Sequence, residues 1–395
     1  MKLSTRGQTA PFVAMDVLSE ATRLEAGGAP VLHMEVGEPA FGAPRAALEA
    51  LAAAEGRGET LGYTSGLGTA RLREAIAALY ERRHGLTLDP GRVVVTAGSS
   101  GAFVLAFLAL FEAGDRVALA DPGYPAYRNT LSALGLEAVR LETDLATRYQ
   151  PTPMHLAAAR AAQPVQGLLV ASPANPTGTM LDELALSALI ADCAAHHTAL
   201  IVDEIYHGIT YGDHAVSALE IAEELIVVNS FSKYYAMTGW RIGWMVVPEG
   251  LIRPLQNLAQ NLYICASHPA QAAALGALSP EGEAEAAGHM ADYRRNRETV
   301  MTALASLGFR DIAPADGAFY AYATLPAGWE DSMAFSRRLL AEHHVAATPG
   351  LDFDPVRGGQ TMRFSYAQSP AAIEEAMDRL SRMIAAGPRA EAHGT

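Results

Sequence analysis

Hydrophobic and polar residues form two kinds of block along the first two thirds of the chain. Residues 71–82 show the 3.6-residue period of an amphipathic helix, with Leu72, Ile76, Leu79 and Tyr80 on one side. Shorter apolar runs predict buried strands at 92–96, 116–120, 167–171, 199–203, 225–229 and 242–247. Further helices are expected at 102–111 and 181–196. Strands separated by helices predict a mostly parallel sheet that is covered on both faces.

The pattern changes after about residue 280. Helices are expected at 291–307, 333–343 and 370–386, with strands at 317–323, 345–348 and 361–366. Such a mixture is typical of a smaller α+β unit. We therefore predict an α/β protein with a large domain over residues 45–285, built on a mostly parallel sheet flanked by helices. A smaller α+β domain would combine residues 286–395 with the N-terminal segment 1–44.

Composition and charge narrow the class of protein. Half of the 395 residues are hydrophobic, which excludes an intrinsically disordered chain. A formal net charge of −14 argues against a nucleic-acid-binding surface. The longest apolar run, 101–111, is shorter than the ~20 residues of a membrane span, and no secretion signal is visible. We expect a cytoplasmic protein that binds neither nucleic acid nor membrane.

Cysteine usage agrees with that location. Cys193 and Cys265 are the two cysteines in the chain, and they lie far apart without metal-ligand spacing. This pattern excludes a disulfide framework and favours a reducing compartment. No H-E-x-x-H motif occurs either, so we expect no metal site.

Lysine usage directs attention to one residue. Of the 29 basic residues only Lys2 and Lys233 are lysines, and the rest are arginines. Arginine cannot replace lysine where a neutral amine must form, because the guanidinium group stays protonated. Lys2 lies at the terminus, whereas Lys233 lies in the aromatic and hydroxyl-rich segment NSFSKYYAMTGWRIGW. Lys233 is therefore a candidate reactive amine, and on this count alone an ordinary surface lysine is the alternative.

Polar side chains follow the predicted strands. Ser99 and Ser100 come after strand 92–96 and open a helix, whose free N–H groups suit a phosphate group; a simple helix cap is the alternative. Asp203 ends strand 199–203 and could pair with a cationic ring nitrogen or cap a helix. Ligands of α/β sheets bind at the carboxyl ends of strands, so a shared site is indicated. Further candidates near these strand ends are Asn175, Tyr206, Ser230, Ser232, Lys233 and Arg241.

Several segments carry a resemblance to a known family. The block SFSKYYAMTGWRIGW is highly specific, and it occurs with VGEP, YTSGLGTARLREAIAALY, TAGSSGAF, DPGYPAYRN, SPANPTG and VDEIYHGITYG in the family's order. Over nearly its whole length the chain resembles the class I aminotransferases. These are pyridoxal-phosphate enzymes of fold type I, the aspartate aminotransferase-like superfamily.

The resemblance implies pyridoxal 5'-phosphate as the cofactor. Lys233 would hold the cofactor aldehyde as a Schiff base and carry the reacting proton. Asp203 would keep the pyridine nitrogen protonated, and Tyr206 and Asn175 would hydrogen-bond the phenolic oxygen of the ring. Tyr124 would stack on the ring. The phosphate contacts that the family implies are Ser99, Ser100, Ser230, Ser232 and Arg241, with Tyr63 reaching over from the second subunit of a homodimer with shared active sites.

The resemblance also implies where the substrate binds. Arg363 would clamp the α-carboxylate in a bidentate manner, with contributions from the Gly37 backbone and from Asn175; a surface ion pair is the alternative for Arg363. Residues 12–15 and Tyr263 are expected to shape the pocket, as they do in relatives. The implied activity is transfer of an amino group between an L-amino acid and a 2-oxo acid.

Two other functions share this fold and cofactor. A carbon–sulfur β-lyase begins with the same loss of the α-proton, so the residues do not exclude it. A non-enzymatic vitamin B6-binding regulator usually carries a DNA-binding module ahead of the fold, whereas only about 30 residues precede VGEP here. The amino donor and the oxo-acid acceptor are left open, because no arginine identifies itself as the second cation that a dicarboxylic substrate needs.

Overall fold

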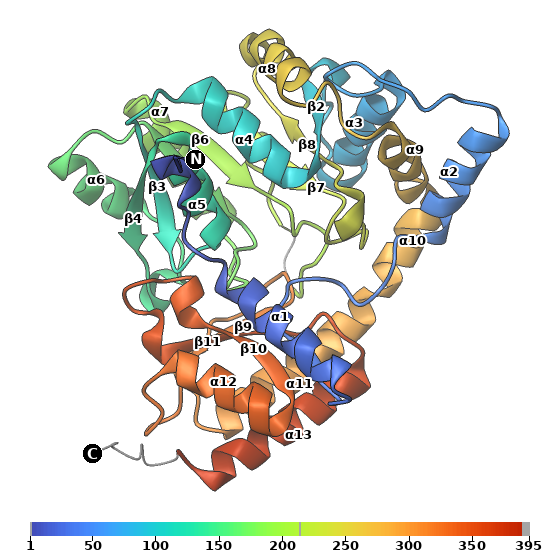
Figure 1. The fold of residues 1–395 in the computed structure, drawn as a ribbon. Helices are drawn as coiled ribbons and strands as arrows, with labels where there is room; N and C mark the ends of the chain where they lie inside the picture. Colours follow the sequence, from blue (N-terminus) through green and yellow to red (C-terminus); the bar gives the residue numbers. More distant parts are fainter. Residues whose placement is uncertain (1, 213–214, 389–395) are drawn as a thin grey trace.

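The computed structural model describes residues 2–212 and 215–388 and contains two β-sheets (Figure 1). The larger sheet has seven strands in the order β2 (Val93–Thr96), β8 (Gly243–Val246), β7 (Ile226–Ser230), β6 (Ala199–Asp203), β5 (Gly167–Ala171), β3 (Arg116–Asp121) and β4 (Glu137–Glu142). The smaller sheet has four strands in the order β1 (Leu32–Met34), β10 (Val345–Pro349), β11 (Thr361–Ser365) and β9 (Tyr320–Thr324).

Helices surround both sheets. Those that accompany the seven-stranded sheet are α2 (Arg45–Gly56), α3 (Ala70–His84), α4 (Gly98–Leu110), α5 (Pro125–Leu134), α6 (Pro153–Ala162), α7 (Glu183–Ala195), α8 (Glu249–Leu262), α9 (His268–Ala277) and α10 (Pro280–Gly288). Those that contact the four-stranded sheet are α1 (Val13–Ala26), α11 (Met290–Ser306), α12 (Ser332–His343) and α13 (Pro370–Ala386). None of these helices, in the described part of the chain, combines the length and apolar character that a bilayer span requires.

The seven-stranded sheet is mostly parallel, which confirms the predicted fold class. The neighbours β7, β6, β5, β3 and β4 all pair in parallel, and β8 alone runs antiparallel to β2 and to β7. Leu168 and Val170 pack on one face of the sheet, whereas Leu169 packs on the other. Because successive side chains of a strand point to opposite faces, burial of both faces produces the unbroken apolar runs seen in the sequence.

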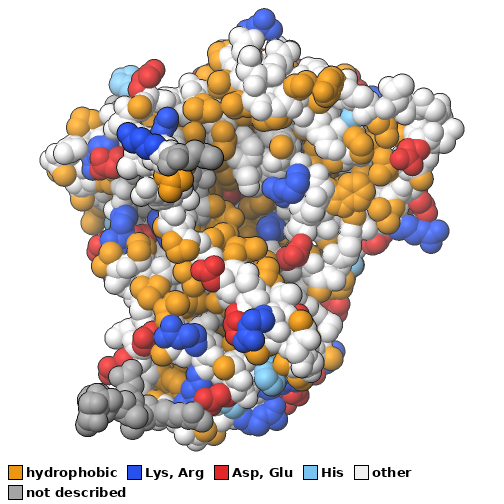
Figure 2. Space-filling model, in the orientation of Figure 1, with side chains coloured by type: hydrophobic (Ala, Val, Ile, Leu, Met, Phe, Trp, Pro, Cys, Tyr) orange, Lys and Arg blue, Asp and Glu red, His pale blue; other side chains and the backbone are white. Residues whose placement is uncertain are grey.

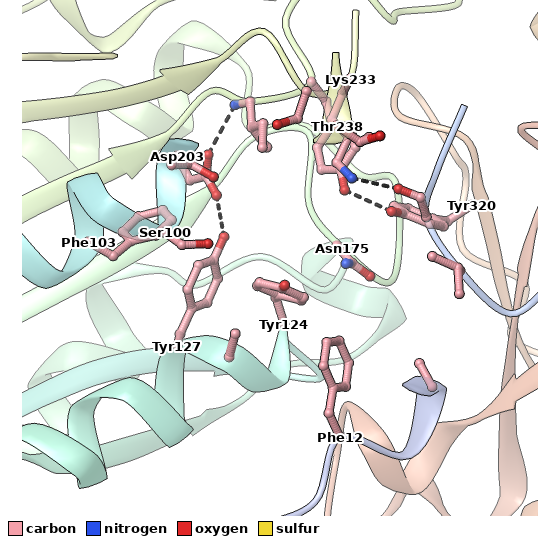
Figure 3. A pocket seen from close by; sticks show the side chains of 18 of the residues that line it. Phe12, Ser100, Phe103, Tyr124, Tyr127, Asn175, Asp203, Lys233, Thr238 and Tyr320 are labelled. Carbon is pink, nitrogen blue, oxygen red and sulfur yellow. Dashed lines mark hydrogen bonds between the residues drawn. The ribbon is translucent and has the colours of Figure 1, made fainter. Parts of the chain in front are cut away.

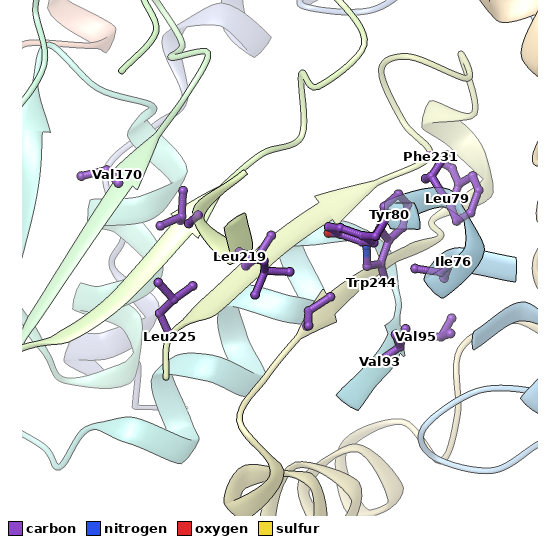
Figure 4. Close-up of a cluster of buried hydrophobic side chains, with 14 of the residues drawn as sticks. Ile76, Leu79, Tyr80, Val93, Val95, Val170, Leu219, Leu225, Phe231 and Trp244 are labelled. Carbon is purple, nitrogen blue, oxygen red and sulfur yellow. The ribbon is translucent and has the colours of Figure 1, made fainter. Parts of the chain in front are cut away.

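One face of this sheet packs against α3, as the periodicity of residues 71–82 predicts. Leu72, Ile76, Leu79 and Tyr80 are all buried, and Figure 4 shows Tyr80 at the Trp244 ring of β8, whose Nε1 donates to the Tyr80 hydroxyl at 3.3 Å. Burying each large apolar side chain stabilises the fold by roughly 1.5–3 kcal/mol. Helix α3 is therefore held on the sheet mainly by its apolar face. This packing helps to fix the position of the strands that carry the candidate polar residues at their ends.

Strand register brings the predicted polar positions to one edge of the sheet. Asp203 pairs with Ala171 on β5 and with Val228 on β7, while Gly243 of β8 pairs with Ser230. Parallel strands end on the same side, so the loops that follow them start close together. The sheet thus gathers residues that are separated by more than 100 positions in the sequence.

The four-stranded sheet joins the two ends of the chain. Strand β1 pairs in parallel with β10, while β10–β11 and β11–β9 are antiparallel. Asp352 accepts hydrogen bonds from the Val13 and Ala14 N–H groups, each at 3.1 Å, and so caps the start of α1. Figure 1 shows α1 lying against this sheet, below the seven-stranded one. The domain boundaries near residues 45 and 285 stay a prediction.

Candidate active site

A cavity of about 250 Å³ lies where the two sheets meet, at the carboxyl ends of the parallel strands. Figure 2 shows the hollow from outside, and Figure 3 shows the side chains that point into it. Its wall is formed by Phe12, Ala14, Met15, Val36, Gly37, Ser99, Ser100, Phe103, Tyr124, Ala126, Tyr127, Thr130, Asn175, Asp203, Ile205, Tyr206, Ser232, Lys233, Thr238, Arg241, Tyr320 and Arg363.

Lys233 lies just after β7 and points into this cavity. Its Nζ donates a hydrogen bond to the Gly37 carbonyl oxygen at 2.5 Å. Removal from water lowers the pKa of Lys233 to about 8, because the charged ammonium loses hydration that one carbonyl does not replace. A sizeable fraction of the amine is therefore neutral near physiological pH. The structure rules out an ordinary surface lysine at this position.

Asp203 ends β6 at the floor of the cavity and is 3% exposed. Its carboxylate accepts hydrogen bonds from the Tyr127 hydroxyl and from the Ile205 N–H, the latter at 3.0 Å (Figure 3). Burial raises the pKa of Asp203 to about 6 despite these two bonds. Among the described residues no lysine or arginine forms an ion pair with it. A cationic ring nitrogen beside this carboxylate would favour its ionised form.

The N-terminus of α4 and Arg241 form a cradle for an anion. Gly98 adopts a left-handed φ of +69°, and a Cβ there would lie 2.4 Å from Arg241 Nη2. Arg241 donates to the Thr238 carbonyl oxygen at 2.8 Å. Ser99, Ser100 and Ser232 line the same end of the cavity. Backbone N–H groups, hydroxyls and a guanidinium group together are the donors that a phosphate group requires.

Ser230 occupies a supporting position. Its Oγ lies 2.8 Å from Ser232 Oγ and 3.1 Å from the Ile242 carbonyl oxygen, and it is not part of the cavity wall. Ser230 thus orients Ser232 in this structure. Its predicted direct contact with phosphate stays a prediction.

Arg363 of β11 enters the cavity from the four-stranded sheet and is 2% exposed. Its Nη1 donates to Asn175 Oδ1 at 2.9 Å, and its Nη2 donates to the Glu35 carbonyl oxygen. The Tyr320 and Phe353 rings each lie 4.6 Å from its guanidinium carbon. All of these partners are neutral, and the buried Nε has none. The positive charge is therefore still available to a bound carboxylate, which a surface ion pair would not allow.

Tyrosine rings line the space between the carboxylate and the guanidinium group. Tyr206 is buried, and its hydroxyl lies 2.8 Å from the Tyr320 hydroxyl. Burial raises the pKa of Tyr206 well above its ordinary value, so the hydroxyl keeps its proton at neutral pH. Tyr124 lines the cavity and meets the Phe12 ring edge to face at 5.8 Å.

Two residues expected near the site do not line the cavity of their own chain. Tyr63 is 82% exposed, and its predicted phosphate contact across a subunit interface stays a prediction. Tyr263 lies outside the wall, packed beside the cluster of buried side chains that surrounds α4. In contrast, Phe12, Ala14 and Met15 do form part of the wall, as expected for residues 12–15.

Other members of the wall were not predicted from the sequence. Tyr127 follows Tyr124 by three positions at the start of α5, so helical spacing could have placed both on one side. Tyr320 lies within an apolar strand, where no local signal separates it from core residues. Phe103 and Thr238 likewise belong to the wall without a distinctive pattern.

The donor set fits pyridoxal phosphate. Small residues are required where its phosphate would lie, since a Cβ at Gly243 would come within 3.0 Å of the Ser99 nitrogen. The buried Asp203 carboxylate, the Lys233 amine and the Arg241 guanidinium group line the same cavity. The guanidinium group suits the phosphate, the carboxylate suits the ring nitrogen, and the amine suits the aldehyde carbon.

Known proteins resemble this chain over nearly its full length. The sequence profile of "Aminotransferase class I and II" matches residues 29–380. A Mycobacterium tuberculosis protein named valine–pyruvate aminotransferase is 46% identical over 385 residues, which cover 97% of this chain and 98% of the relative.

Solved structures of other aminotransferases also resemble this chain. A Silicibacter pomeroyi putative aminotransferase is 51% identical with a TM-score of 0.90, and it matches over 98% of this chain and 100% of its own. The Thermus thermophilus aspartate aminotransferase with maleate is 31% identical with a TM-score of 0.90, over 97% of this chain and 99% of its own. These relatives favour transamination over the β-lyase and regulator alternatives.

The cavity chemistry and the relatives lead to the same assignment. The chain belongs to the class I and II aminotransferases, pyridoxal-phosphate-dependent enzymes that transfer an amino group between an amino acid and a 2-oxo acid.

Proposed function

We propose that this enzyme transaminates amino acids with apolar side chains, using pyruvate as the acceptor. The use of charge in the cavity supports the donor preference, and pyruvate is the acceptor that the name of the 46% identical relative gives. The lysine and arginine side chains in its described wall are Lys233, Arg241 and Arg363. Each has a proposed role in binding the cofactor or the α-carboxylate, which every amino-acid substrate carries. In this chain's described part of the wall, none is left for a second substrate carboxylate. Phe12, Met15 and Val36 offer an apolar surface instead.

Each charged side chain has a proposed task. Pyridoxal phosphate, when bound, supplies an aldehyde carbon for the amino group and a ring that accepts electrons. Lys233 binds the cofactor and moves the proton at the substrate α-carbon, because its depressed pKa lets the amine act as a base. Asp203 would hold the ring nitrogen protonated, and Tyr206 and Asn175 would donate hydrogen bonds to the phenolic oxygen.

Arg363 orients the substrate for proton transfer. A guanidinium group binds a carboxylate through two parallel hydrogen bonds, which fixes the direction of the α-carbon–hydrogen bond. The Gly37 carbonyl oxygen contacts Lys233, so the backbone beside the carboxylate clamp also positions the base. Orientation of substrate and base toward each other accounts for a large part of enzymatic acceleration.

We also propose a cytoplasmic homodimer with shared active sites. Arg241 is exposed on the side of the anion cradle that faces solvent, and Tyr63 projects from the surface. A second copy that donates Tyr63 would cover the phosphate and bury the exposed ring. Both cysteines are unpaired, which suits a reducing compartment.

Lys233→Ala is expected to abolish turnover and the change of cofactor absorbance with pH, because Lys233 is the lysine in the described cavity wall and supplies the amine for the aldehyde. Spectrophotometric titration and a steady-state assay measure both effects. Lys2→Ala is the matched control, since it removes the only other lysine and should change neither. Borohydride reduction and peptide mapping should place the adduct on Lys233; turnover that survives its loss would refute the assignment.

Arg363→Ala is expected to raise KM for amino and oxo acids by roughly 10- to 150-fold, the value of a hydrogen-bonded charge. Cofactor absorbance should still titrate, because the cofactor contacts remain. Arg357→Ala is the control, since Arg357 pairs with Asp354 outside the cavity wall. An unchanged KM would remove Arg363 from the substrate site.

The donor preference can be tested with valine, leucine, aspartate and glutamate at a fixed pyruvate concentration. We expect kcat/KM for valine to exceed that for aspartate by at least about tenfold, because a side-chain carboxylate would lie in the cavity without a cation. Alanine formation measures the rate. Equal or higher kcat/KM for aspartate would contradict the apolar assignment and leave the transaminase activity intact.

Tyr63→Phe is expected to weaken cofactor retention about tenfold, the effect of losing one hydrogen bond to a charged phosphate. Equilibrium dialysis measures the retention, and sedimentation checks that the variant stays dimeric. Tyr149→Phe is a control for loss of a tyrosine hydroxyl, because this hydroxyl donates to the Asp311 carbonyl oxygen outside the cavity wall. Retention equal to that of the control would make the intersubunit contact wrong.

A further inference from the structure

We propose that Tyr320 is a positioning residue that links the cofactor side of the cavity to the carboxylate clamp. Its hydroxyl would orient Tyr206, and its ring would hold the Arg363 guanidinium group in place. The proposal rests on the functions proposed above for Tyr206 and Arg363, and it adds a residue that no sequence motif identifies. Figure 3 shows Tyr320 at the side of the cavity opposite Asp203 and Tyr127.

The hydroxyl contact has a defined direction once Tyr206 donates to the cofactor. The two hydroxyl oxygens lie 2.8 Å apart, and either could donate in the free protein. A phenolic hydroxyl has one proton to donate and lone pairs that can accept. If the Tyr206 hydroxyl donates its hydrogen bond to the phenolic oxygen of the cofactor, Tyr320 must be the donor in the Tyr206–Tyr320 pair. Accepting that bond makes Tyr206 a stronger donor.

Burial leaves the Tyr206–Tyr320 hydrogen bond with little access to water. Tyr320 is 1% exposed and Tyr206 is 4% exposed, so water has little access to replace either partner. The two rings also meet edge to face at a centroid distance of 5.7 Å. Their relative orientation is therefore set by packing as well as by the hydrogen bond.

The ring of Tyr320 forms one side of the Arg363 site. The guanidinium carbon lies 4.6 Å from the Tyr320 ring and 4.6 Å from the Phe353 ring. Two rings at this distance attract the cation and restrict where its plane can turn. A bidentate clamp needs that restriction, because both nitrogens must face the carboxylate together.

Gly37 leaves the space that Tyr320 needs. A Cβ built on Gly37 would lie 1.7 Å from the Tyr320 hydroxyl oxygen, so no larger residue fits there. The Gly37 carbonyl oxygen accepts from Lys233 on the same segment. Tyr320 therefore touches three elements of the site: the phenol beside the cofactor, the carboxylate clamp and the backbone that holds the base.

Two substitutions distinguish the effect of the Tyr320 hydroxyl from the effect of its ring. Tyr320→Phe keeps the ring beside Arg363 and removes the donor to Tyr206. The pKa at which the visible absorbance of the bound cofactor titrates should rise by roughly 0.4 to 1 unit, as expected for the loss of one buried hydrogen bond. KM for amino and oxo acids should stay within about twofold, because the ring contact remains. Spectrophotometric titration of the holoenzyme measures the first effect without turnover.

Tyr320→Leu removes the ring as well. In addition to the spectral shift, KM for amino and oxo acids should rise roughly 2- to 30-fold, the range that corresponds to a lost cation–π contact. Steady-state kinetics with valine and pyruvate measure the change. A KM equal to that of Tyr320→Phe would overturn the role of the ring.

Tyr322→Phe is the matched control. Tyr322 lies two positions further along β9, is equally buried, and forms a 2.7 Å hydrogen bond with Thr361 outside the cavity wall. It should lose thermal stability like Tyr320→Phe but leave the cofactor titration unchanged. An unshifted titration in Tyr320→Phe, or an equal shift in Tyr322→Phe, would overturn the role of the hydroxyl. If the wild-type cofactor spectrum did not depend on Lys233, the proposed function itself would fail.

Discussion

The chemistry of this cavity depends on charged side chains whose partners are neutral. Arg363 donates to an amide oxygen and to a backbone carbonyl, Lys233 and Arg241 donate to carbonyl oxygens, and Asp203 accepts from a hydroxyl and an N–H group. Neutral hydrogen-bond partners hold a charged group in place and leave its charge uncompensated, whereas the opposite charge of an ion pair would neutralise it. The cavity therefore keeps two guanidinium groups, an amine and a carboxylate available for ligands of opposite charge.

These charged groups come from different parts of the fold. Asp203 ends β6 and Lys233 follows the adjacent strand β7 of the seven-stranded sheet, whereas Arg363 belongs to β11 of the four-stranded sheet. Each side chain is thus fixed by a different part of the fold. The same arrangement explains the lowered pKa of Lys233, since burial and nearby cations both disfavour the charged amine.

Much of the fold could be predicted from local pattern, and the exceptions have physical reasons. The buried strands and α3 were predicted because packing on both sheet faces or along one helix face leaves a clear period. Strand β4 was missed because it is an edge strand, where half-exposed positions carry glutamate and arginine. Helix α10 was not predicted, because its many small and acidic residues give a weak apolar period.

The sequence alone determined the identity of the chemical groups and their order. Lys233 stood out because the chain uses arginine almost everywhere else, and Asp203, Ser99 and Ser100 stood out because they follow strands. These signals are local, so one segment is enough to carry them. The tertiary structure alone decided which groups touch. Tyr206 and Tyr320 lie 114 positions apart, and their hydroxyls meet only because two separate sheets pack against each other around the cavity.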